Sequence, residues 1–144
     1  MQIDRPFQQA TELLQVRTKG RGFYEITARA IAFINTTKID MGLLTLFCRH
    51  TSASLLITEN ADPDVLKDLE AAFSQLAPEN AGYLHDAEGS DDMPAHIRAA
   101  LTQTQISIPV IQSMPSLGAW QGMFLYEHRH SSHVREIALH VIGQ

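Results

Sequence analysis

The sequence has only one cysteine, no long apolar run and no large basic cluster. Cys48 has no partner for an intrachain disulfide, so we expect a reducing, cytoplasmic setting. No apolar run approaches the roughly 18 residues needed to cross a bilayer, and the N-terminal MQIDRPFQQ lacks the charged and apolar regions of a secretory signal. The net charge is −5, and no basic cluster exceeds Arg17, Lys19 and Arg21. We therefore expect no membrane and no nucleic acid among its partners.

The length and composition are those of one ordinary globular domain. The chain has 144 residues, of which 44% are hydrophobic and 19% are charged. These values exclude disordered and fibrous classes and allow a sizeable core. We expect a single domain over residues 1–144, without repeats or linkers.

Alternating apolar residues predict most of the strands. Residues 7–18 alternate in part, and residues 42–59 are long enough for two strands or for one strand with a bulge near 51–54. Residues 106–111 form a short apolar segment with Pro109 inside it, which is typical of an edge strand or a bulge. Two more strands are expected over 119–129 and 134–143.

Three segments predict helices. Apolar residues recur at helical spacing over 26–34, and Asp62-Pro63-Asp64 is a strong helix start. The apolar stripe that follows it as far as Leu76 is expected to be core. A short helix should begin near Asp91 or Asp92, either of which could cap it. The fold class is therefore α+β, with a predominantly antiparallel sheet that closes on itself or packs on a second sheet, and about three flanking helices.

The segment HDAEGSDDMPAHIRAAL, residues 85–101, is the first candidate site. It holds two histidines, His85 and His96, among four carboxylates, including Glu88 and Asp92. Neutral imidazoles are the commonest transition-metal ligands, and carboxylates join or orient them. Two histidines alone are a weak signal, and a third ligand has to come from elsewhere. Surface histidines in a solvated acidic loop are the alternative.

The segment around His50 is the second candidate site. His50 ends the apolar stripe of Leu44, Leu46 and Cys48, so it is either a hydrogen-bonded core histidine or a ligand. The hydroxyl residues that follow it either bind a polar ligand or satisfy a bulge; they are Thr51, Ser52 and Ser54.

Three separated blocks carry a resemblance to a known family. HTSASLLITENADPDVLKDLE, HDAEGSDDMPAHIRAAL and WQGMFLYEHR resemble the YjbQ-type family, sometimes called secondary thiamine-phosphate synthases, over about residues 20–143. The resemblance implies a β-sandwich-like, partly jelly-roll subunit assembled as a homotrimer. It also implies a metal site on His85, His96 and His128. The chain departs from the family pattern at Ala119, where relatives have threonine, and at Glu136, which replaces one arginine of a pair.

The resemblance favours an enzyme over the other functions considered. The family activity joins a pyrimidine pyrophosphate to a thiazole phosphate, and the native substrate is open. We expect a divalent metal, Zn²⁺ more than Mg²⁺, because imidazoles suit zinc and magnesium prefers oxygen ligands. The alternative is a non-catalytic module that binds a metal or a small ligand, and a purely structural role is the third reading.

Each candidate residue has an expected role in that enzyme. Asp92 or Glu88 would orient a ligand or act as the general base, with His50 and Glu59 as the next candidates. Arg129 or Arg135 would neutralise leaving-group charge. The expected substrate-binding residues are Thr51, Ser52, Ser54, Gln121, Arg129 and Arg135.

Overall fold

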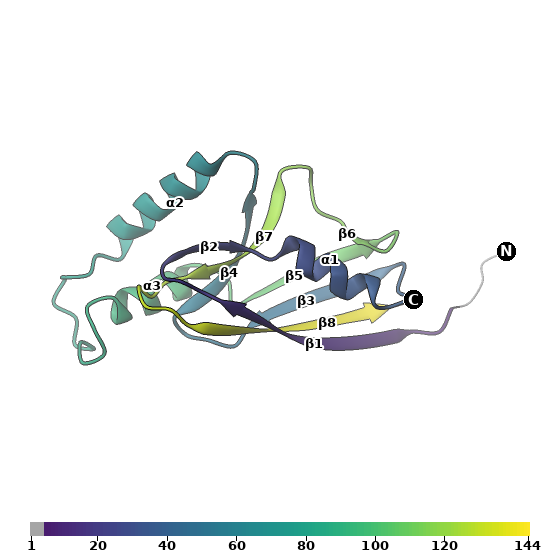
Figure 1. Cartoon of the computed structure of the whole chain (residues 1–144), viewed down its shortest axis with the longest axis horizontal. Coiled ribbons are helices and arrows are strands. Elements are labelled where there is room, and N and C mark those ends of the chain that lie inside the picture. The colour runs from purple at the N-terminus through teal and green to yellow at the C-terminus, as the bar shows by residue number, and fades with distance from the viewer. Residues whose placement is uncertain (1–4) are drawn as a thin grey trace.

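Two antiparallel sheets form the body of the chain in this computed structural model, which describes residues 5–144 (Figure 1). Residues 1–4, the start of the N-terminal segment that lacks the features of a secretory signal, lie outside the described residues. The five-stranded sheet has the order β1 (Gln8–Arg17), β8 (Val134–Gly143), β3 (Gly42–Cys48), β5 (Gln105–Ile111) and β6 (Met114–Pro115). The three-stranded sheet has the order β2 (Gly22–Glu25), β7 (Gln121–Glu127) and β4 (Ala53–Glu59). The helices are α1 (Thr27–Asn35), α2 (Pro63–Leu76) and α3 (Asp92–Leu101).

The core lies where the two sheets and α1 meet. Apolar residues alternate along β3 and β8, and their register brings Leu44 opposite Val141 and Leu46 opposite Leu139. These four side chains are at most 1% exposed. Because side chains alternate between the faces of a strand, the pairing buries one face of the sheet as a continuous apolar layer. The α+β class with antiparallel sheets is confirmed.

Several local predictions are confirmed by these elements. Residues 42–59 form two strands, β3 and β4, rather than one bulged strand. Asp62 caps α2 by accepting a hydrogen bond from the backbone N–H of Asp64 at 2.9 Å, with Pro63 at the first helical position. Strand β5 is not the last strand of its sheet, but only its residues Val110 and Ile111 pair with β6. At Pro109, β5 therefore lies at the sheet edge, as predicted.

The prediction that the apolar stripe of α2 is core is wrong. No residue of α2 is fully buried, and Leu76 is 63% exposed. The helix stands apart from the sheets at one end of the molecule (Figure 1). The other apolar residues of its stripe, Val65, Leu66, Leu69 and Phe73, are only partly buried. Among residues 5–144, no helix is long and apolar enough to cross a membrane.

The chain changes sheets between β7 and β8, and this crossing positions the site. Ala53, the first residue of β4, pairs with Glu127, the last residue of β7, and β8 begins at Val134 in the other sheet. The end of β3 lies beside the same edge, because Cys48 pairs with Ile137 of β8. Strand ends from both sheets therefore converge next to α3, which contacts β4.

Candidate metal centre and adjoining cavity

Two histidines and one aspartate form a compact group, here called the His–Asp–His cluster (His85, Asp92 and His96). One ligand atom from each residue lies within 4.8 Å of the other two. The Asp92 Oδ2 atom is 2.6 Å from His85 Nε2 and 3.2 Å from His96 Nε2. Asp92 and His96 are four residues apart on α3 and so share one helix face, whereas the loop before α3 supplies His85. The structure thus brings together two of the three predicted metal ligands, with a carboxylate between them.

Asp92 is held in place by Arg129. The Arg129 guanidinium donates from NH1 to Asp92 Oδ1 at 2.6 Å, from Nε to Asp91 Oδ2 at 3.1 Å, and from NH2 to the Glu88 carbonyl oxygen at 2.9 Å. All three nitrogens are engaged, so the structure places Arg129 as a support for the carboxylates and not as a free cation at a substrate.

Neither aspartate caps α3, which corrects the capping prediction. Asp91 precedes the helix but makes no side-chain cap hydrogen bond. Its Oδ2 atom instead accepts from Arg129 and from the backbone N–H of His130 at 2.8 Å. These carboxylates tie the start of α3 to the end of β7.

Ionisation within the cluster follows these contacts. Burial alone would raise the pKa of Asp92, but the hydrogen bond with His85 and the charges of His96 and Arg129 hold that pKa below its usual value. The hydrogen bond to Asp92 raises the pKa of His85, as do the negative charges of Asp92 and Glu88. Glu88 lies 3.4 Å from His85 Nε2. An anionic centre beside two imidazoles attracts a cation or protons.

The tautomer of His96 tests whether a metal fits. His96 Nδ1 lies 3.0 Å from the Thr51 carbonyl oxygen, which only accepts, so Nδ1 carries the proton. In a neutral ring, Nε2 then has a lone pair that faces the carboxylate of Asp92 across 3.2 Å. Two facing acceptors repel each other unless a proton or a cation lies between them. Two imidazoles and one carboxylate are also a common ligand set for zinc and similar ions.

His128 lies outside this cluster. Its ring is fully buried, and its Nε2 atom is 2.8 Å from Ser54 Oγ. Burial, together with the charges of Arg98, Arg21 and Arg135, lowers the pKa of His128 to about 3. Its Nδ1 atom has no hydrogen-bond partner within residues 5–144. The geometry thus assigns Asp92, and not His128, as the third member of the group.

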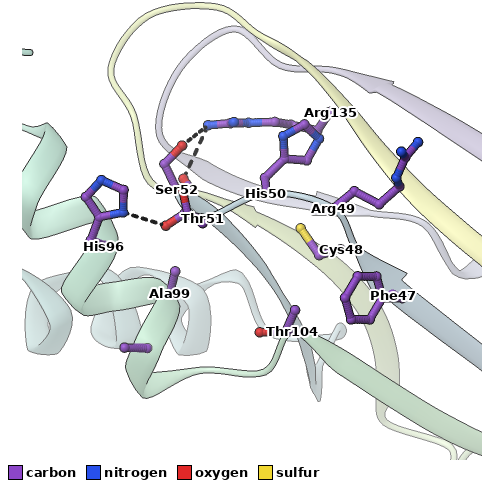
Figure 2. A pocket seen from close by; sticks show the side chains of 11 residues that line it. Phe47, Cys48, Arg49, His50, Thr51, Ser52, His96, Ala99, Thr104 and Arg135 are labelled. Carbon is purple, nitrogen blue, oxygen red and sulfur yellow. Dashed lines mark hydrogen bonds between the residues drawn. The ribbon is translucent and has the colours of Figure 1, made fainter.

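The main cavity, of about 770 Å³, opens beside the cluster (Figure 2). Its polar side is formed by Arg49, His50, Thr51, Ser52, His96 and Arg135. Its other wall includes Phe47, Cys48, Ala99 and Ala100. His96 belongs to both the cluster and the cavity, so a molecule in the cavity is adjacent to the cluster. Burial raises the pKa of the Cys48 thiol, which is therefore not an activated nucleophile.

A second cavity borders the cluster on the His85 side. It has a volume of about 390 Å³, and its lining includes Glu79, Tyr83, His85 and Gly89. The cluster therefore lies between two cavities, with one histidine in the lining of each.

A buried ion pair supports the polar side of the main cavity. Glu127 is 0% exposed and accepts from Arg135 Nε at 2.8 Å and NH2 at 2.5 Å. Thr18 donates to the same carboxylate at 2.7 Å. These donors and the nearby charge of Arg135 hold the pKa of Glu127 below its usual value, although burial opposes them. Arg135 also donates to Ser52 Oγ at 3.0 Å, so the pair holds the loop that lines the cavity.

Three further predicted site residues, Ser54, Glu59 and Gln121, line neither cavity. Ser54 is 1% exposed and hydrogen-bonded to His128. Glu59 pairs with Gln121 at the far end of β4 and β7, six positions from the Ala53 and Glu127 pair. At about 3.3 Å per residue, that separation is roughly 20 Å. Gln121 accepts a hydrogen bond from the Gly118 N–H at 2.8 Å and so closes its own turn.

Two buried charged residues near the site, Glu127 and Arg98, are not predicted from the sequence. Arg98 is 0% exposed and donates to both oxygens of Glu70 at 3.0 Å and to Tyr126 OH at 3.0 Å. It joins α3 to α2 through this contact. A charged residue at the end of an otherwise apolar strand, such as Glu127, was the available signal. Its partner, Arg135, could not be predicted, because the pairing depends on the crossing between sheets.

Comparisons with known proteins agree on one family. Residues 12–144 match the sequence profile described as UPF0047 protein YjbQ-like. A UPF0047 protein of Synechocystis sp. is 49% identical over 96% of this chain and 95% of its own. The UPF0047 protein YjbQ of Escherichia coli O157:H7 is 39% identical over 91% of this chain and 96% of its own. A crystal structure of a YjbQ/UPF0047 protein from Clostridium acetobutylicum superposes with a TM-score of 0.84 at 28% identity, covering 90% of this chain and 98% of the other.

Proposed function

The chain belongs to the YjbQ-like UPF0047 family, and from this premise and the site geometry we propose that it is a metal-dependent enzyme acting on a small phosphorylated substrate. One observation carries the proposal. The ligand atoms of His85, Asp92 and His96 lie within 4.8 Å of one another, and His96 also lines a cavity of about 770 Å³. A metal at that boundary would meet a substrate in the cavity.

The metal we propose is Zn²⁺, with His85, Asp92 and His96 as its ligands. Imidazoles favour Zn²⁺ over Mg²⁺, which prefers oxygen ligands. Bound there, the ion would supply a Lewis acid to a phosphate oxygen or to water. Asp92 thereby takes the position of the ligand that the resemblance gave to His128.

The chain's own residues supply orientation and proton transfer in this proposal. Thr51 fixes the His96 tautomer through its carbonyl oxygen, and Arg129 fixes the Asp92 carboxylate. Glu88 is the exposed carboxylate beside the cluster, 65% exposed and 3.4 Å from His85 Nε2, and we assign it as the general base.

The reaction we propose to test first is thiamine-phosphate synthesis, in which a thiazole phosphate displaces pyrophosphate from a pyrimidine pyrophosphate. The support is the family resemblance together with a cavity that has both polar and apolar walls. We also propose a homotrimer and a cytoplasmic, reducing location, from the resemblance and from the single cysteine, Cys48.

The test combines metal analysis with a turnover assay. Protein purified without chelators should contain or take up about one zinc ion per chain, and the loaded protein should form thiamine phosphate from the two precursors. Metal binding without turnover on these or other phosphorylated substrates would favour the alternative, a non-catalytic binding module. Failure to take up any divalent transition metal would exclude the metal-dependent enzyme and a metal-binding module, and would leave only a module that binds a small ligand.

A further inference from the structure

The imidazole of His50 lies in the wall of the main cavity and has one nitrogen committed to the protein (Figure 2). The backbone N–H of Glu136 donates to His50 Nε2 at 2.8 Å. Nε2 is therefore an acceptor, and in the neutral ring the proton resides on Nδ1. Within the described range, 5–144, this is the one hydrogen bond that the His50 ring makes. The Nδ1–H group is thus the polar group of this ring that remains for a bound molecule.

The surroundings of His50 keep the ring neutral. Burial and the nearby Arg135 lower the pKa of His50, and Arg49 acts in the same direction. The carboxylates of Glu136 and Glu127 oppose this without reversing it. A second proton on Nε2 would also confront the Glu136 N–H. His50 is consequently a hydrogen-bond donor of fixed tautomer and not a base.

The cations around the cavity are already neutralised. Arg135 is paired with the buried carboxylate of Glu127, and Arg49 is paired with Glu136 at 2.7 Å. No surplus positive charge faces His50 from these pairs. The opposite wall offers the apolar side chains of Phe47 and Ala99. A phosphate would gain little there, because burying an anion requires an unpaired cation.

We propose that His50 is a specificity-determining residue whose Nδ1–H donates to an uncharged acceptor of the ligand, a carbonyl oxygen or a heterocyclic ring nitrogen. A phosphate of the same ligand would lie toward the His–Asp–His cluster instead. This inference rests on the proposed function only in taking the main cavity as the substrate pocket. Its tests use no turnover and no metal, so its failure is distinguishable from failure of the proposed function.

The first test reads the tautomer and the ligand class by NMR. Protein labelled with ¹⁵N-histidine, before and after chelation, should show His50 neutral and protonated on Nδ1 at pH 7, with assignment from a His50→Gln sample. Titration with 2-pyridone, a neutral carbonyl heterocycle, should shift the His50 signals in a saturable way, and inorganic phosphate should not. An Nε2-protonated ring, a shift with phosphate, or no shift with 2-pyridone would overturn the proposal.

The second test separates donation to a ligand from a structural role. In His50→Gln the side-chain oxygen can reach the Nε2 position and keep the Glu136 contact, but the Nδ1 donor is lost. In His50→Asn the amide nitrogen can occupy the Nδ1 position, but the Glu136 contact is lost. We expect His50→Gln to keep its melting temperature and bind 2-pyridone about tenfold more weakly, the effect of one hydrogen bond. His50→Asn should show the opposite pattern. Normal binding by His50→Gln would assign His50 a structural role and refute the proposal.

Discussion

His96 donates a hydrogen bond from Nδ1 to the carbonyl oxygen of Thr51 across 3.0 Å, and this contact joins α3 to the loop between β3 and β4. Because the acceptor is backbone, any residue at position 51 would preserve it. The contact fixes the ring so that Nε2 faces Asp92. One histidine therefore orients the cluster and borders the main cavity.

Removing either cluster histidine should strongly weaken zinc binding. His85→Ala and His96→Ala each delete one of three candidate ligands, so we expect zinc affinity to fall by more than the roughly 10 to 100-fold typical of losing an outer-shell partner. Isothermal titration with Zn²⁺ on chelated protein would measure this. His140→Ala is the matched control, because His140 lies in β8 and contacts Gln9 instead of the cluster. Equal affinity in all three variants would refute the site.

The two neighbouring aspartates should respond differently to amidation. Asp92→Asn removes the charge between the histidines, so zinc affinity should fall strongly while the protein stays folded. Asp91 contacts Arg129 and the His130 N–H but neither cluster histidine. Asp91→Asn should keep zinc binding and lower the free energy of unfolding by about 1 to 3 kcal/mol, the cost of weakening charged hydrogen bonds. Identical zinc affinities in the two variants would contradict this assignment.

The sequence predicted the local parts of the site but not its long-range pairings. Asp92 and His96 are separated by one helical turn, and His85 is in the adjoining loop, so their proximity follows from local structure. His128 is distant in sequence from the three cluster residues. Its position depends on which elements pack over the end of β7. It is fully buried and bonded to Ser54, which no periodicity could reveal.

The fold was likewise predictable where it depends on local sequence and not where it depends on long-range packing. Capping by Asp62 and the alternation in β3 and β8 are local and were predictable. The apolar stripe of α2 was also visible, but a stripe shows only that a helix face can be buried, not what covers it. In this chain Arg98 anchors α2 through Glu70, and the stripe stays half exposed.

Stability should fall as the pH drops below the usual pKa of histidine, because His128 resists protonation when folded. Its folded pKa is about 3, lowered from 6.5, so the unfolded state binds this proton first as the pH falls. The contribution of His128 to the free energy of unfolding is fully present above pH 6.5 and is lost progressively as the pH falls to about 3. Between pH 6.5 and 5 the loss from this residue should be roughly 1.7 kcal/mol, because the slope approaches about 1.36 kcal/mol per pH unit once the unfolded side chain is mostly protonated.

Urea unfolding at several pH values would measure that loss. His128→Gln can keep a contact to Ser54 and does not titrate, so its pH dependence should be shallower than that of the wild type by the same amount. If the free energy of unfolding changed with pH equally in the wild type and in His128→Gln, His128 would be accessible to protons in the folded state.

The exposed apolar residues of α2 should lie in subunit contacts of the proposed homotrimer. Leu76 is 63% exposed, and the other large apolar residues of this amphipathic helix are only partly buried. A continuous apolar stripe that the chain itself does not cover is a candidate contact surface. Sedimentation equilibrium should give three times the chain mass of 16.0 kDa. Leu76→Glu should weaken the assembly, and Gln75→Glu, an exposed neighbour, is the control for added charge. A monomer at micromolar concentration, or a trimer equally stable in both variants, would contradict this placement.

Neutralising Glu127 should turn the main cavity into an anion site. Glu127→Gln leaves Arg135 buried with its charge uncompensated, which should destabilise the fold by about 3 to 5 kcal/mol. Because phosphate can supply the missing negative charge, the variant should bind phosphate, and 10 mM phosphate should raise its melting temperature more than that of the wild type. Thermal unfolding of chelated protein at constant ionic strength would measure both effects, because phosphate bound by the proposed zinc ion would otherwise stabilise every variant.

The second ion pair of the cavity provides the control for that experiment. Glu136→Gln frees Arg49, whose side chain is 52% exposed, so its charge is already hydrated and the stability change should stay below about 1 kcal/mol. Phosphate should have little effect on this variant, because an exposed cation gains little from one more anion. Glu127→Gln should therefore respond to phosphate and Glu136→Gln should not. An equal response in the two variants, or a wild type that already responds, would mean that the Arg135 charge is not compensated in the folded protein.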